Sequence, residues 1–442
     1  METYAHIVGW GMYLPEKVLT NDELSQKVDT SDEWIRSRTG IRERRIASEK
    51  ETTASMAIFA AREALDRARI RPADVDLVVV ATLTPEHVMP STASLVQDAL
   101  GAKNAGAFDL SAGCTGFVYA LSTAAGMIRG GAAKVAVVIG AETMSRIIDW
   151  EDRSTCVLFG DGAGAVVLQA SEEPGGVLST MLGSDGAGGN HLILPAGGSK
   201  MPTTARTVAE RQHFMKMNGP EVFRFATRVM GRAAKTACEK AGIELNDIDL
   251  FIPHQANTRI IKSATKYLKL NPDKVYENLH KYGNTSSASI PIALCEAIAS
   301  GQVKEKDNLV FVGFGGGLTW GATVVQWGIP VPYQARQKWY RTLRQTYYRW
   351  ANISSKVGWL LRSVESRLAR RPALLPLEDQ SKETVPQTDI HLTKNGYNGS
   401  LNGHNGYHGQ SLNGKNGTHP IPENGDEIDK IKSPNGKDHP LN

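Results

Sequence analysis

The sequence contains only four cysteines, and no two of them stand close enough to form a CxxC pair. Cys114, Cys156, Cys238 and Cys295 are far apart, so their spacing predicts neither a zinc site nor a disulfide framework. No apolar run approaches the roughly 18 residues of a membrane-spanning helix, and the first residues lack a basic stretch followed by a long apolar one. We therefore expect a cytoplasmic protein without a metal site or a membrane-spanning helix.

The chain also lacks a strong excess of charge of one sign, because 50 Lys and Arg residues face 46 Asp and Glu residues. We expect no nucleic-acid partner. With 442 residues, of which 41% are hydrophobic and 22% charged, the chain has an ordinary globular composition and ample length for a large core. Residues 1–335 are nearly balanced in charge, whereas residues 336–371 are strongly basic and residues 372–442 slightly acidic.

Buried strands alternate with Ala-rich helices along the first 330 residues, which predicts an α/β fold. The pattern occurs twice, because residues 52–82 and 221–255 both read as a helix, a short loop with Asp, and a buried strand. We therefore predict two duplicated halves, residues 1–170 and 171–330, with a pocket between them.

Cys114 lies in FDLSAGCTGFVYAL, where a strand turns through Ala112 and Gly113 into a helix. A helix start favours the thiolate through its dipole and free amides, so Cys114 is a candidate nucleophile. The alternative is a small inert core residue, which is our interpretation of the other three cysteines.

His254 follows the buried strand DLFIP, and Asn284 follows a glycine in HKYGNTSSASIP. A histidine at the end of a strand is well placed for a pocket, although a lone one is usually structural. Asn284 taken alone reads as a helix N-cap. The duplication places Cys114 and Asn284 at nearly corresponding turns, and this match favours a functional role for the set.

Two glycine-rich segments have different meanings. GFGGGLTWG, residues 313–321, follows the strand NLVFV and would let backbone amides approach a substrate oxygen, as in an oxyanion hole. GDGAGA, residues 160–165, is not a dinucleotide-binding motif, because it leads into a strand and not into a helix.

Taken together, these motifs give residues 1 to about 328 a specific resemblance to β-ketoacyl-acyl-carrier-protein synthase III, a condensing enzyme of the thiolase superfamily. The matching segments are VDTSDEWIRSRTGIRERR, AGCTGF, RSTCVLFGDGAGAVVL, HQANTRI, YGNTSSASIP and GFGGGLTWG. The resemblance implies a five-layered αβαβα fold, a homodimer, no cofactor, and acyl-CoA and acyl carrier protein as substrates.

The resemblance also implies residue roles. Cys114 would be the nucleophile, His254 and Asn284 the catalytic pair, and the amides of Cys114 and Gly316 the oxyanion hole. The coenzyme A site would contain Thr30, Trp34, Arg38, Arg153 and Asn257, and the acyl pocket Met89 and Phe314, with Met89 reaching into the partner subunit.

The reaction implied is a decarboxylative condensation of an acyl-CoA primer with malonyl-acyl carrier protein. Thiolate attack builds charge on the thioester oxygen, which backbone amides can stabilise. Loss of CO2 then leaves an enolate, to which neutral His254 and the Asn284 amide can donate hydrogen bonds. Two alternatives stay open: a relative that uses a polyketide or quinolone-type acceptor, and an inactive scaffold that binds carrier protein.

Four basic residues recur at helical spacing in TRIIKSATKYLK, namely Arg259, Lys262, Lys266 and Lys269. A solvated charged face is the usual meaning of such a row. Because the helix starts beside His254 and an acidic carrier protein is the implied substrate, we favour a docking role.

The chain continues for more than 100 residues beyond the part that resembles the family. We predict that residues 331–371 contain a basic amphipathic helix with Trp339 and Trp350 on its apolar side, typical of peripheral membrane contact or of packing against the body. Residues 372–442, in which Asn-Gly pairs recur, are predicted to be disordered.

Overall fold

The computed structural model describes residues 2–328, and a five-stranded sheet forms its first half. The strand order is β1-β7-β6-β4-β5, with β4 parallel to β5 and β6, and β7 antiparallel to both β1 and β6. All residues of β4 and β6 are buried, as expected for strands covered on both faces. The strands are β1 Tyr4–Tyr13, β4 Leu77–Ala81, β5 Gly106–Leu110, β6 Val135–Thr143 and β7 Asp161–Ser171.

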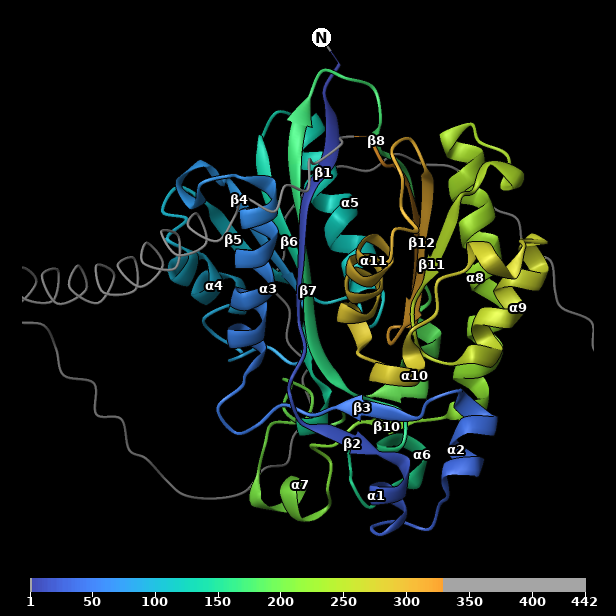
Figure 1. Ribbon diagram of the computed structural model, residues 1–442. Coiled ribbons are helices and arrows are strands. Elements are labelled where there is room, and N and C mark those ends of the chain that lie inside the picture. The colour runs from blue at the N-terminus through green and yellow to red at the C-terminus, as the bar shows by residue number, and fades with distance from the viewer. Residues whose placement is uncertain (1, 329–442) are drawn as a thin grey trace, which may run out of the picture. The chain divides into compact units, whose positions relative to one another are not determined.

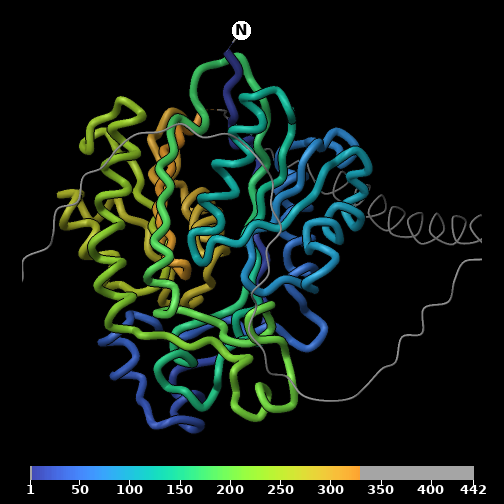
Figure 2. Tube along the Cα trace, turned by 180° about the vertical axis from the view of Figure 1, so that it is seen from behind, coloured from blue at the N-terminus to red at the C-terminus, as the bar shows by residue number. Residues whose placement is uncertain are grey.

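A second sheet has the order β11-β12-β13-β8. It contains β8 Gly176–Ser184, β11 Leu250–Pro253, β12 Asn308–Gly315 and β13 Thr319–Gln326. Although β8 follows β7 directly in the chain, it pairs with β13, and Figure 2 shows the green strand beside the orange ones. The two sheets are therefore joined at the point where the sequence passes from one predicted half to the other.

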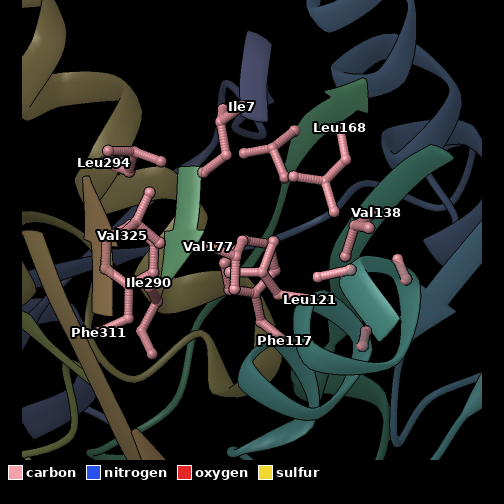
Figure 3. Packing of buried hydrophobic residues seen from close by; sticks show 14 of the residues in the cluster. Ile7, Phe117, Leu121, Val138, Leu168, Val177, Ile290, Leu294, Phe311 and Val325 are labelled. Atoms are coloured by element: carbon pink, nitrogen blue, oxygen red, sulfur yellow. The ribbon is translucent and has the colours of Figure 1, made fainter. Parts of the chain in front are cut away.

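Helices form three layers around the two sheets (Figure 1). α3 and α4 cover the outer face of the first sheet, and α8 and α9 cover the outer face of the second. α5 and α11 lie between the sheets, where Phe117 and Leu121 of α5 belong to the same buried cluster as Ile290 and Leu294 of α11 (Figure 3). The expected five-layered αβαβα fold is thus confirmed. The helices are α3 Thr53–Ala68, α4 Thr92–Leu100, α5 Gly116–Arg129, α8 Gly219–Ala241, α9 Thr258–Leu268 and α11 Ser289–Ala299.

The sequence repeat corresponds to matching elements, because α3 leads into β4 and α8 leads into β11, each through a short 3-10 turn. Smaller elements gather at one end of the molecule, near the start of α9 (Figure 1). They are β2 Val18–Thr20, α1 Asn21–Ser25, α2 Asp32–Thr39, β3 Glu43–Arg45, α6 Arg153–Cys156, β9 Leu192–Ile193, α7 Ala205–Ala209, β10 Lys216–Met217 and α10 Leu279–Tyr282.

The predicted amphipathic helix in residues 331–371 and the predicted disordered tail, residues 372–442, lie outside the described residues. Within residues 2–328, no helix has both the length and the apolar character needed to cross a membrane. The boundary at residues 170 and 171 stays a prediction; it falls at the end of β7.

Candidate active site

Cys114 lies in the turn between β5 and α5, where the sequence places it. Cys114 is 4% exposed, and its thiol is not part of a disulfide. The other three cysteines are also free thiols. α5 begins two residues later at Gly116. The thiol is therefore held at the start of a central helix, in the layer between the two sheets.

The ionisation of Cys114 differs from the sequence-based expectation of a lowered pKa. The pKa of this thiol is raised to about 12, chiefly by burial and to a smaller extent by the nearby charge of Glu142. A hydrogen bond with the hydroxyl of Ser286 and the amide of Cys114 itself act in the opposite direction. In the free protein the cost of desolvating a thiolate thus exceeds the benefit of the helix start.

Glycines allow two backbone segments to meet beside Cys114. A Cβ atom on Gly113, whose φ is +59°, would lie 2.7 Å from the amide nitrogen of Gly316. A Cβ atom on Gly315 would lie 2.4 Å from the amide nitrogen of Cys114. The turn after β12 and the turn of the nucleophile therefore approach at distances that exclude side chains, which brings the backbone of Gly316 close to that of Cys114.

His254 is buried at the end of β11, with its backbone amide donating to Val312 O at 2.7 Å. Burial lowers the pKa of the imidazole to about 3, so the ring is neutral at physiological pH. Its Nδ1 lies 2.6 Å from the hydroxyl of Ser289, which also accepts from the amide of Gln255 at 3.4 Å. We infer that the Ser289 hydroxyl donates to Nδ1, an arrangement that leaves the imidazole proton on Nε2.

The Nε2 atom of His254 has no hydrogen-bond partner among the described residues, although it is buried. A buried polar atom without a partner is unusual and indicates a group reserved for a ligand. The ring also meets Phe314 edge to face, with centroids 5.3 Å apart. The imidazole is thus fixed in place with one N–H left to donate.

Asn284 does not act as the N-cap of α11, which begins at Ser289. Its side-chain oxygen accepts from the backbone amide of Ser286 at 2.8 Å, and its own backbone N–H donates to Leu158 O at 2.8 Å. Engagement of the oxygen orients the carboxamide so that its NH2 group is the end left to donate. Asn284 is 6% exposed, so this orientation is set inside the protein.

A cavity of about 310 Å³ opens beside the nucleophile turn. Backbone from the two glycine turns forms one wall, and apolar side chains form the other. The lining residues are Leu83, Ser111, Ala112, Gly113, Ile147, Leu192, Ile193, Leu194, Met215, Gly316, Gly317 and Thr319. Such a wall suits an acyl or pantetheine chain better than a charged ligand.

The predicted coenzyme A residues gather at the end of the molecule that holds α2 and α6. The guanidinium carbon of Arg153 lies 5.1 Å from the ring centre of Trp34, and Arg153 donates to the carbonyl of Asp29 at 2.7 Å. The neighbouring Thr30 hydroxyl is buried without a partner among the described residues.

Arg38 and Asn257 are joined at the start of α9. The side-chain amide of Asn257 donates to Arg38 O at 3.1 Å, and its oxygen caps the helix by accepting from the amide of Arg259. Arg38 is exposed, and so is Arg153 of the same end. Exposed cations near a half-buried indole suit an adenine ring and phosphates.

The basic row on α9 is confirmed as an exposed face. Arg259, Lys262, Lys266 and Lys269 are all exposed, while the opposite face buries Ile260, Ile261, Ala264 and Leu268. None of the four forms an ion pair within residues 2–328.

The two predicted acyl-pocket residues are not brought together within the described chain. Phe314 is buried beside His254, whereas Met89 is 86% exposed in the loop between β4 and α4, next to Val88 at 94%. Val88 and Met89 thus form an exposed apolar pair on this loop.

Three residues of the site are absent from the sequence analysis. Ser289 orients His254, and Ser286 and Glu142 stand next to Cys114. A charged residue at the end of the buried strand VAVVIGAE was a signal that could have identified Glu142. Among residues 2–328 no cluster of His, Cys, Asp and Glu is arranged to hold a metal ion.

Comparisons with known proteins agree on one family. Two family models match: the one described as 3-Oxoacyl-[acyl-carrier-protein (ACP)] synthase III over residues 108–186, and its C-terminal counterpart over residues 238–327. A β-ketoacyl-[acyl-carrier-protein] synthase III of Symbiobacterium thermophilum is 56% identical over 322 residues, which cover 73% of this chain and 98% of the relative.

Solved structures give the same picture. A 3-oxoacyl-[acyl-carrier-protein] synthase III from Aquifex aeolicus has a TM-score of 0.68 and 49% identity, covering 73% of this chain and 99% of that one. The priming β-ketosynthase of the R1128 polyketide biosynthetic pathway has a TM-score of 0.69 and 37% identity, covering 74% and 98%. The fold is therefore shared both with a synthase III and with a priming enzyme of a polyketide pathway.

Proposed function

The chain belongs to the β-ketoacyl-[acyl-carrier-protein] synthase III family of acyl-transferring condensing enzymes, and we propose that Cys114, His254 and Asn284 carry out its reaction. That reaction condenses an acyl-CoA primer with malonyl-acyl carrier protein and so initiates fatty acid synthesis. The products are 3-ketoacyl-acyl carrier protein, CoA and CO2.

In the first half-reaction, the sulfur of Cys114 attacks the thioester carbonyl of the primer. Negative charge then develops on the carbonyl oxygen, and the amides of Cys114 and Gly316 stabilise it. The close approach of their two turns supports this pairing. Collapse of the adduct expels CoA and leaves the acyl group on Cys114.

In the second half-reaction, malonyl-acyl carrier protein loses CO2 and forms an enolate, which attacks the acyl-cysteine. The Nε2–H of His254 and the NH2 group of Asn284 donate to the enolate oxygen. The observation that carries this assignment is the buried, neutral and unpartnered Nε2 of His254. Neither group has to move a proton for CO2 to leave.

The substrates would approach from the end of the molecule where α2, α6 and α9 meet. Thr30, Trp34, Arg38, Arg153 and Asn257 suit the nucleotide part of coenzyme A. The apolar cavity beside Gly113 suits the acyl or pantetheine chain. The unpaired basic row on α9 suits an acidic carrier protein, since charges at the rim of an interface mainly speed association.

We further infer a homodimer in which the exposed Val88 and Met89 pack against the second copy, where Met89 would meet an acyl pocket that includes Phe314. Each chemical step uses groups of the chain and its substrates, so no cofactor is included. We place the enzyme in the cytoplasm, with peripheral membrane contact through residues 336–371.

The 56% identity to the Symbiobacterium thermophilum synthase III, against 37% to the polyketide priming enzyme, supports a fatty acid acceptor over a secondary-metabolite one. The complete and ordered Cys, His and Asn set argues against an inactive scaffold.

The test separates the two half-reactions. His254→Ala and Asn284→Ala should still accept an acyl group from acetyl-CoA, measured by mass spectrometry. Release of CO2 from malonyl-acyl carrier protein should fall about 10²-fold or more in each, as for loss of one oxyanion donor. Normal CO2 release in both variants would refute the assignment.

A further inference from the structure

Glu142 is a charged residue that the proposed mechanism does not use. It lies at the end of β6, its exposure is 0%, and it forms no ion pair within residues 2–328. Burial raises the pKa of its carboxyl group. A carboxylate buried without a cation is costly to a protein, so its presence calls for a function.

Neutral donors from two loops surround the Glu142 carboxylate. From the loop after β4, the amide of Leu83 and the hydroxyl of Thr84 approach it at 3.1 Å and 2.7 Å. From the loop before α11, the hydroxyls of Ser286 and Ser287 approach it at 3.1 Å and 2.8 Å. The hydroxyl of Thr82 lies 3.2 Å away. None of these donors is charged.

Ser286 connects this carboxylate to the nucleophile. Its hydroxyl donates to Glu142 Oε1 at 3.1 Å, and the same hydroxyl, by hydrogen bonding, acts to lower the pKa of the Cys114 thiol. Ser286 has a φ of +50°, a left-handed conformation that is uncommon for serine. The Asn284 side chain holds this conformation by accepting from the Ser286 amide. Backbone strain of this kind is found most often at functional positions.

The surroundings of Glu142 can accommodate a proton. The Ser287 hydroxyl lies 2.8 Å from both Glu142 Oε1 and the carbonyl oxygen of Ala81, and it has only one proton to donate. It can donate to an ionised Glu142. When Glu142 is protonated, the same hydroxyl can donate to Ala81 and accept from the carboxyl group. Both protonation states therefore keep their hydrogen bonds.

We propose that Ser286 and Glu142 form a proton relay that takes the thiol proton of Cys114 during acylation. The S–H bond of Cys114 breaks and its proton passes to the Ser286 oxygen, while the Ser286 proton passes to Glu142 Oε1. When the adduct expels CoA as a thiolate, the proton returns by the same route to that sulfur. Glu142 is again ionised and no proton is gained or lost.

The relay explains how a buried thiol reacts at neutral pH. Loss of its proton to solvent would add a second negative charge beside Glu142, where both side chains are buried. Transfer to Glu142 keeps the number of charges at one and removes the repulsion between the two groups. The new thiolate then lies at the start of α5, where the helix dipole favours it.

The inference rests on Cys114 as the proposed nucleophile, so its test avoids acyl-CoA. Full-length protein is treated with iodoacetamide between pH 6 and about 10, a range that includes the pKa of an ordinary thiol. Alkylation of the peptide that contains Cys114 is followed by mass spectrometry. Ser286 and Glu142 face the thiol, and His254 is a further titratable group of the proposed site.

Ser286→Gly is the decisive variant, because it removes the hydroxyl while glycine tolerates the positive φ. It should slow alkylation at pH 7 by about 10²-fold, as for loss of a positioned base, and shift the pH profile upward. Glu142→Gln should have the same effect. Alkylation of the double variant should be no slower than that of the slower single variant, because either substitution alone already breaks the relay.

Two controls separate the relay from general damage. Ser179→Ala removes a similarly buried hydroxyl in β8, which donates to Ala237 O, and should leave the profile unchanged. Ser287→Ala removes a donor to Glu142 but keeps the Ser286 contact, so its effect should be smaller than that of Ser286→Gly.

A wild-type pH profile in folded Ser286→Gly would overturn the relay. That result would leave the proposed function intact, because acyl transfer to Cys114 is measured separately. Conversely, acylation of a different residue would refute the role of Cys114 without changing the alkylation profiles.

Discussion

Replacement of Ser289 by alanine tests how the protein prepares His254 for decarboxylation. The Ser289 hydroxyl is buried at the first turn of α11, 2.6 Å from Nδ1 of His254. Its loss removes the donor that keeps the imidazole proton on Nε2. The ring should then spend part of its time with the proton on Nδ1, where it cannot donate to the enolate.

The expected size of the effect follows from the bond that is lost. A neutral hydrogen bond contributes about 1 kcal/mol, which corresponds to about a fivefold loss of rate. Removal of the whole imidazole in His254→Ala should cost about 10²-fold or more. Ser289→Ala should therefore fall between wild type and His254→Ala in CO2 release from malonyl-acyl carrier protein.

Acylation of Cys114 provides the internal control, because Nε2 of His254 does not act in that step. Ser289→Ala should accept an acyl group from acetyl-CoA at nearly the wild-type rate. Equal losses in both half-reactions would indicate general damage and refute the reasoning. A second result would also refute the reasoning, namely a decarboxylation rate of the wild-type protein that changes with the protonation of a group of pKa near 6.5. Burial lowers the pKa of His254 to about 3, so this imidazole should not titrate there.

Two further predictions concern partners. Charge reversal of Arg259 and Lys266 to Glu should raise the KM for malonyl-acyl carrier protein in a salt-dependent way, whereas kcat should change little; an equal loss with malonyl-CoA would instead indicate an active-site defect. Truncation after Val331 should preserve condensation, because all three proposed catalytic residues precede it. It should reduce sedimentation with anionic liposomes, because each basic residue near the membrane surface contributes about 1 kcal/mol to binding. Deletion of residues 372–442 alone is the matched control and should change sedimentation little. Equal sedimentation of full-length and truncated protein would remove the membrane hypothesis.

Much of the fold could be predicted from the sequence because buried strands and Ala-rich helices leave clear local patterns. The helix and strand at residues 52–82 recur at residues 221–255, and the structure places them in corresponding layers. Cys114, His254 and Gly316 could be proposed from the sequence because each lies within four residues of the end of a strand, where the path of the chain fixes its direction.

The remaining features depend on contacts between distant segments. The hydroxyl of Ser286 meets the carboxylate of Glu142 across 144 positions, and no local pattern reports that contact. The pKa of Cys114 was expected to be low from its place at a helix start. The pKa of this thiol is instead raised by burial, and burial depends on all the layers that surround the thiol.

The most direct test of the central claim is the mass of the Cys114 peptide after full-length protein is incubated with acetyl-CoA. We predict one acetyl group on Cys114 in wild type and in Cys238→Ser, a control that alters a buried cysteine of α8. Cys114→Ser should carry no adduct, because a serine hydroxyl does not ionise comparably at neutral pH. An acetyl group found on another residue, or retained in Cys114→Ser, would contradict the account.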